Sequence, residues 1–262
     1  MTRRGLELLA AAVLYFAAAR LGLALATPVP QVSLIWPPTG IALTLLLLRG
    51  PQLWPALFAG ALAANAMAEE PIGTALVIAC GNTSAGLLAW SLLRRLDFRP
   101  ELHRLRDVLL LQAFGAAVPS VLSASVGTLA LCLGGLQPWS AVPRLWSVWW
   151  LGDAMGVVLL TPFLLLWTAE RPVLPPARRL LEGVLVLTGL AIVAGQVFAS
   201  GIVGIVPQPG LGYLVFPFAM WAALRLGLRG AATAVLLTAS IAIGLTAGGE
   251  PRDLALLQLF LA

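Results

Sequence analysis

Asp153 is the residue whose surroundings raise the first chemical question in this sequence. It follows Gly152 inside a long apolar run, and Gly156 comes three residues later. A carboxylate in such a run is costly to bury and by default marks a functional site in a membrane. Arg20 lies at a similar depth in the first apolar run and is its candidate partner. Two interpretations stay open: a ligand site, or a structural ion pair or protonated carboxyl that holds helices together.

A second unusual segment is W-P-P-T-G at 36–40, which opens another apolar run. Pro37 and the proline after it remove two backbone donors. In a bilayer such a break faces protein or a water-filled cavity. The alternative is an ordinary helix start with proline in its first turn, with Trp36 as an interfacial anchor.

Further polar and aromatic groups lie inside apolar runs or close to their ends. Asn65 and Asn82 place amides at membrane depth, where hydrogen bonds between helices are their default role. Trp149 and Trp150 belong to a tryptophan-rich stretch that is typical of an aromatic belt at the bilayer surface. The same side chains are also suited to line an apolar pocket.

The residues that enzymes and metal sites need are scarce. His103 is the single histidine, which argues against bis-histidine haem, copper sites and Ser-His-Asp hydrolysis. The sequence has no H-E-x-x-H motif or phosphate-binding loop. Cys80 and Cys132 both lie in apolar runs, so a disulfide framework is not expected. We therefore predict no catalytic residue, no metal and no cofactor in this chain.

Composition points to a bilayer protein. Hydrophobic residues make up 60% of the chain, charged residues make up 10%, and the mean hydropathy is +0.96. Soluble domains carry about 25% charged residues. The high isoelectric point does not indicate a nucleic-acid partner, because the arginines form short clusters between apolar runs, where membrane orientation signals occur.

The apolar runs predict an all-α, polytopic membrane bundle with about nine complete spans and a truncated last one. A bilayer crossing needs about 20 apolar residues. The expected spans are 6–26, 33–48, 52–68, 72–93, 108–134, 145–167, 180–200, 211–227, 230–247 and 252 onward.

The basic residues predict the orientation of these spans. All 16 are arginines, and with the N-terminus inside, thirteen fall on inner segments and two on outer ones. This asymmetry follows the positive-inside rule and favours a cytoplasmic N-terminus. The last run stops at Ala262, too short to cross, so we expect either a fragment or a chain that continues into the cytoplasm.

An internal repeat is suggested at an offset of 180 residues. The hairpin at 34–71 aligns with the one at 214–251, and Arg49-Gly50 aligns with Arg229-Gly230. Parallel repeats of this kind occur in transporters. Coincidence between two Leu- and Ala-rich hairpins is the alternative. We otherwise interpret 1–262 as one integral membrane domain.

Four motifs in order resemble those of one family. They are W-P-P-T-G-I-A at 36–42, G-N-T at 81–83, W-W-L-G-D-A-M-G at 149–156 with a later proline, and F-P through R-G-A at 216–231. Together they resemble the type-one membrane-associated sensor (MASE) domain of bacteria. The resemblance implies a sensory module in the inner (plasma) membrane that commonly precedes a cytoplasmic diguanylate cyclase, phosphodiesterase or histidine kinase. This sequence itself contains no such output domain.

These observations favour a signal-input domain of bacterial signal transduction. Its expected partners are the lipid bilayer, an unknown small ligand or membrane protein, and an output domain of the cyclase or kinase type, with a homodimer left open. A small-solute transporter or channel is the alternative, supported by the repeat and the broken second span. A membrane scaffold is a third option.

Overall fold

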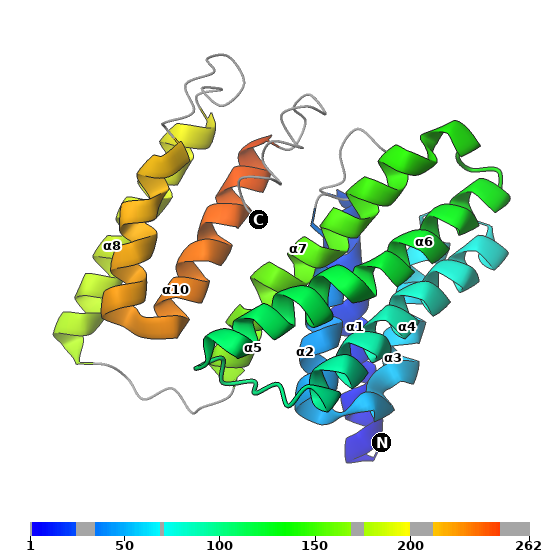
Figure 1. Ribbon diagram of the computed structural model, residues 1–262, viewed down its shortest axis with the longest axis horizontal. Helices are drawn as coiled ribbons and strands as arrows, with labels where there is room; N and C mark the ends of the chain where they lie inside the picture. Colours follow the sequence, from blue (N-terminus) through cyan, green and yellow to red (C-terminus); the bar gives the residue numbers. More distant parts are fainter. Residues whose placement is uncertain (1, 25–34, 69–70, 169–175, 200–211, 247–262) are drawn as a thin grey trace. The chain divides into compact units, whose positions relative to one another are not determined.

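The computed structural model describes residues 2–24, 35–68, 71–168, 176–199 and 212–246, and within these ranges every regular element is a helix (Figure 1). The all-α prediction is therefore confirmed for the described residues. The chain divides into two compact units, 1–161 and 162–262. The tenth expected span, from 252, and the ends of both repeat hairpins lie outside the described residues.

The first unit contains seven helices in the order of the chain. They are α1 (Arg3–Ala24), α2 (Pro37–Arg49), α3 (Trp54–Ala66), α4 (Ile72–Arg95), α5 (Leu105–Leu110), α6 (Val118–Leu133) and α7 (Val142–Thr168), whose last turns extend into the second unit. Helix α1 packs on α2 and α3, and α4 packs on α2, α3 and α6. Small residues such as Ala61, Ala64 and Ala79 fill this core together with Tyr15, so the helices approach closely, as membrane helices do.

Helices α2 and α3 are shorter than the expected spans. Each contains 13 residues, which at 1.5 Å per residue is about 20 Å, whereas the hydrocarbon core is about 30 Å thick. In the described part of the chain, six helices are long and apolar enough to cross a membrane. The expected count of about nine complete spans is therefore not supported, because two apolar runs form short helices and two others form one bent helix.

A π-helical turn, Leu111–Ala117, joins α5 to α6 within the span expected at 108–134. Pro119 lies two residues after the end of this turn and cannot donate a backbone hydrogen bond. The indole Nε1 of Trp150 donates to the carbonyl oxygen of Ala117 at 2.9 Å. A side chain of α7 thus supplies a donor where the helical ladder is interrupted, and such π-turns frequently mark functional sites.

The second unit is built around α8 (Ala177–Ala199) and α10 (Phe216–Thr246). Helix α10 bends sharply at Gly227, where φ is 69° and ψ is −159°. The limb after Gly227 runs back beside the limb before it (Figure 1). The two spans expected at 211–227 and 230–247 correspond to these limbs. Gly230, in the turn expected between them, lies three residues after the observed bend.

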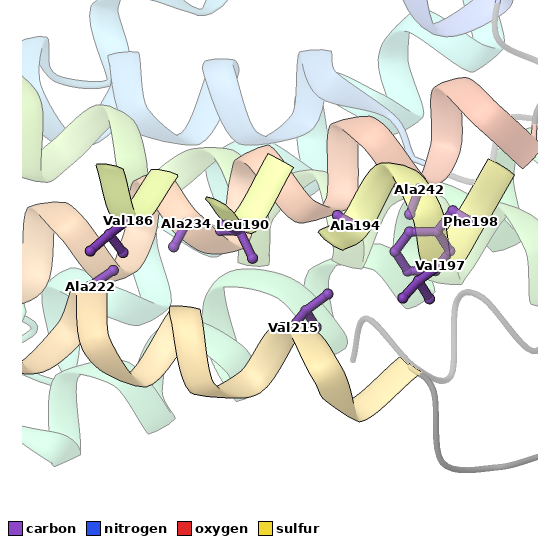
Figure 2. Packing of buried hydrophobic residues seen from close by; sticks show 9 residues of the cluster. All are labelled: Val186, Leu190, Ala194, Val197, Phe198, Val215, Ala222, Ala234 and Ala242. Carbon is purple, nitrogen blue, oxygen red and sulfur yellow. The ribbon is translucent and has the colours of Figure 1, made fainter. Parts of the chain in front are cut away.

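Side chains of α8 fill the space between the two limbs of α10. Val186 and Leu190 point toward Ala222 and Ala234, and Phe198 lies near Ala242 at the other end (Figure 2). Nine buried apolar residues from the two helices and the turn before α10 form this cluster. Because all three α10 members of this cluster are alanines, the limbs can lie close to α8.

Large apolar side chains cover the outer faces of both units. On α1 they include Leu6, Leu9 and Val13, and on α8 Leu181 and Leu185, all more than half exposed. A water-soluble fold would bury these side chains, whereas lipid tails solvate them at no cost. Together with the six long apolar helices, this confirms a multi-pass membrane protein.

The bend in α10 gives a first prediction. The backbone at Gly227 has a conformation that is essentially restricted to glycine, so Gly227→Ala should destabilise the protein by about 1–3 kcal/mol. A methyl group there would meet no atom within 4 Å, so the cost comes from the backbone alone. Thermal unfolding of the purified protein in detergent, followed by circular dichroism, measures it.

Gly244→Ala is the matched control for this prediction. Gly244 lies in the regular part of the same helix and also has open space around it. Alanine should be neutral there or stabilise the helix by up to about 1 kcal/mol. Equal unfolding temperatures for the two variants would contradict a backbone-strained bend at Gly227.

Candidate functional site

The W-P-P-T-G motif at 36–40 and the W-W-L-G-D-A-M-G motif at 149–156 lie against each other in the first unit. Helix α2 begins at Pro37, so both prolines occupy its first turn, as the helix-start interpretation expects. A methyl group on Gly40 would overlap the carbonyl oxygen of Gly156 on α7, and one on Gly156 would overlap the carbonyl oxygen of Trp36. The start of α2 and the middle of α7 therefore touch backbone to backbone.

Hydrogen bonds hold this crossing together. The backbone N–H of Trp36 donates to the carbonyl oxygen of Gly152 at 2.9 Å. The hydroxyl of Thr161 donates to the carbonyl oxygen of Gly40 at 3.1 Å. Both bonds run between a backbone group of the α2 motif and α7, so the close approach leaves these polar groups satisfied, as buried groups require.

The crossing brings α2 to the carboxylate of Asp153. The hydroxyl of Thr39 donates to Oδ1 of Asp153 at 2.6 Å, a distance typical of a charge-assisted bond. Asp153 is 1% exposed. Its second oxygen, Oδ2, accepts no hydrogen bond of normal geometry in the described part of the chain, although the side chains of Ser123 and Trp149 also interact with the carboxylate. Thr39 thus satisfies one oxygen fully, and the other is at most weakly satisfied.

Helices α4 and α6 complete the polar surroundings. The indole Nε1 of Trp149 donates to Ser123 Oγ at 3.2 Å, and that hydroxyl donates to Asn82 Oδ1 at 2.9 Å. The Tyr15 hydroxyl of α1 lies beside the side chain of Asn82. Side chains from five helices therefore meet in one buried network.

A small cavity lies at the centre of this network. Its volume is about 10 Å³, close to the smallest space that holds one water molecule. We use the name Asp153 cluster for its polar lining residues: Thr39, Asn82, Ser120, Ser123 and Asp153. The Ser120 hydroxyl, like Asp153 Oδ2, has no hydrogen-bond partner among the described residues.

The other residues singled out from the sequence lie around or away from this cluster. Trp150 stacks on Trp146 with 6.1 Å between ring centroids. The structure does not bring Arg20 to Asp153, because Arg20 is exposed and its Nη1 is 3.5 Å from the carbonyl oxygen of Met67. Asn65 donates through Nδ2 to the carbonyl oxygen of Ala61 in its own helix.

Sequence reasoning missed three members of the Asp153 cluster. Thr39 is part of a recognised motif, but its partner Asp153 is 114 residues away. Ser120 and Ser123 are common hydroxyl residues in an apolar run and have no distinguishing neighbours in the sequence. The one usable signal was Pro119, because a proline inside a span marks an irregular backbone.

A second buried carboxylate, Asp107, has the opposite environment. Arg104 donates to it through Nε at 2.7 Å and Nη2 at 2.6 Å, and the N–H of Arg99 adds a bond of 3.0 Å. The hydrogen bonds with Asp107 raise the pKa of the Arg104 guanidinium. Asp107 therefore orders the arginine-rich loop before α5, and both of its oxygens are occupied.

Comparison with protein families decides where the chain belongs. The MASE1 family model matches residues 7–262, essentially the whole chain. The chain belongs to the MASE1 family. No curated protein and no solved structure matches it. As a MASE1 domain it is a membrane-associated sensor domain, and the family is sensory rather than catalytic.

The backbone contact between α2 and α7 gives a second prediction. Gly40→Ala or Gly156→Ala would place a methyl group on a backbone oxygen of the other helix. Overpacking of this kind costs about 1–3 kcal/mol, so each variant should unfold at a lower temperature. Tryptophan fluorescence during heating in detergent measures the loss.

Gly73→Ala on α4 serves as the control, because a methyl group there meets no atom within 4 Å. It should unfold like the wild-type protein. If Gly40→Ala kept wild-type stability as well, the two motifs would not be in backbone contact.

Proposed function

We propose that this MASE1 domain is the signal-input part of a bacterial inner-membrane signalling protein, and that it regulates a cytoplasmic output module. The observation that carries the proposal is the Asp153 cluster: the two motifs typical of the family dock on each other around a buried, half-satisfied carboxylate. Ionisable groups at membrane depth are expensive and serve function by default.

The packing of α2 on α7 is an equilibrium that a signal can shift. Anything that satisfies Asp153 Oδ2 stabilises the observed packing of α2 on α7, and anything that competes with Thr39 weakens it. A ligand shifts such an equilibrium only by its difference in affinity for the two packings. A small ligand, a membrane protein or a second copy of the chain are the partners proposed to provide this difference.

The distribution of arginines supports a cytoplasmic N-terminus. In the first unit, Glu7 near the start of α1 lies 3.3 Å from Arg49 at the end of α2, so these two arginine-bearing ends are neighbours (Figure 1). In the second unit, Glu182 near the start of α8 pairs with Arg225 before the bend of α10 at 2.6 Å. In each unit, arginine-bearing helix ends therefore lie together, which is the clustering that the positive-inside rule favours.

Transport of a small solute is the competing function. It is favoured by the short helices α2 and α3, because transporters commonly build substrate sites from interrupted helices. The proposed repeat adds to it: Gly50 and Gly227 both have positive φ at hairpin turns, although Gly227 is three residues before the position aligned with Gly50. The single domain and its repeat hairpins remain proposals.

A fusion of residues 1–262 to a cytoplasmic diguanylate cyclase or histidine kinase tests the signalling proposal. Asp153→Asn keeps the shape of the side chain but removes its charge. It should change the output of the fused enzyme by about fivefold or more, the usual lower range of coupling between sites. Reporter expression in cells, normalised to the amount of membrane-inserted fusion protein, is the measurement.

Asp97→Asn is the control, because Asp97 is 72% exposed in its side chain and lies outside the Asp153 cluster. It should leave the output unchanged. Wild-type output from Asp153→Asn, combined with Asp153-dependent solute flux in reconstituted vesicles, would replace the sensor proposal with the transporter.

A further inference from the structure

We propose that the Asp153 cluster binds one Na⁺ ion. This proposal rests on the proposed function, because the ion is the ligand of the same site.

Every polar residue that lines the cavity carries a side-chain oxygen. They come from three chemical types: the Asp153 carboxylate, the Asn82 amide and the hydroxyls of Thr39, Ser120 and Ser123. Hard cations prefer such ligands. The site differs from transition-metal sites, and no group of three or more His, Cys, Asp or Glu side chains suited to a metal occurs among the described residues.

The unused capacity of these groups is mainly that of acceptors. The hydroxyl of Thr39 donates its hydrogen bond to Asp153 Oδ1, and the hydroxyl of Ser123 donates to Asn82 Oδ1. Oδ2 of Asp153 can only accept while it is ionised, and it accepts no hydrogen bond of normal geometry from the described residues. These groups therefore keep unused lone pairs beside the cavity, and a cation satisfies several lone pairs at once.

The charge of the site also lacks a counter-ion. None of the residues that line the cavity is basic, and the candidate partner Arg20 lies at the surface beside Met67. An ionised carboxylate buried without a counter-charge is strongly destabilising. A single positive charge in the cavity neutralises Asp153, whereas a water molecule would supply hydrogen bonds but no charge.

The size of the cavity restricts the ligand to a small, dehydrated ion. A volume of about 10 Å³ leaves no room for an organic molecule or a hydrated ion. Mg²⁺ normally keeps several of its waters, and Ca²⁺ takes six to eight oxygens. One carboxylate and a handful of neutral oxygens instead match a monovalent ion, and Na⁺ is smaller than K⁺.

Cation binding can be measured on the full chain without an output domain. The protein in lipid nanodiscs is titrated with NaCl against choline chloride at constant ionic strength, and tryptophan fluorescence is recorded. Trp149 donates to Ser123 at the edge of the cavity, so we expect a saturable change with Na⁺ and a weaker one with K⁺. Binding of radioactive sodium should reach one ion per chain.

Two variants test which residues hold the ion. Asp153→Asn removes the charge and should abolish the saturable response. Ser120→Ala should weaken the apparent affinity by about tenfold, the usual effect of one lost hydrogen-bonding ligand. Thr128→Val is the matched control, because Thr128 is also a buried α6 hydroxyl without a partner among the described residues but does not line the cavity.

Several outcomes overturn the proposal. A wild-type protein that responds equally to Na⁺ and choline shows only an ionic-strength effect. A response that survives in Asp153→Asn places the ion elsewhere, and a response to pH with none to Na⁺ assigns a proton to Oδ2. If Asp153→Asn fails to fold, equal affinities for Ser120→Ala and Thr128→Val overturn the site. A failed fusion reporter with intact Na⁺ binding would instead disprove only the signalling role.

Discussion

The contact between Gly40 on α2 and Gly156 on α7 is the constraint on which the candidate site depends. Lipid tails are as apolar as leucine, so membrane helices gain little from hiding apolar surface from each other and associate through close packing and hydrogen bonds. Two glycines remove the side chains that would keep the backbones apart. This approach places Thr39 within 2.6 Å of Asp153, and the two prolines in the first turn of α2 remove two of the backbone donors that a helix start otherwise leaves unpaired.

The two buried carboxylates show how the same residue type serves different purposes. Asp107 is fully occupied by Arg104 and by the backbone of Arg99, which fixes a loop in one conformation. Asp153 has a hydroxyl on one oxygen and a cavity beside it. A saturated carboxylate is a structural anchor, because breaking its bonds leaves buried charges unpaired. A half-saturated carboxylate is a site that a ligand can still complete.

The sequence predicted the local features and missed the relations between distant ones. Asp153 and the W-P-P-T-G segment stood out because their residue types are costly or irregular in a bilayer. The partnership of Thr39 with Asp153 was not predictable, since it depends on which faces of α2 and α7 meet. Arg20 was a candidate partner of Asp153 on the ground of depth alone, but depth does not specify the direction of a side chain around the helix, and Arg20 lies at the surface. The number of spans was overestimated because hydropathy measures composition and not the length over which the backbone stays helical, as α2 and α3 show.

The bend at Gly227 divides α10 into a short limb and a longer one. The limb of α10 before the bend begins at Phe216 and is about 17 Å long at 1.5 Å per residue, too short to span the hydrocarbon core by itself. During synthesis this limb leaves the ribosome before the longer one. Its described length does not cross the hydrocarbon core alone, so we infer that the two limbs of α10 enter the membrane together as a hairpin that packs on α8.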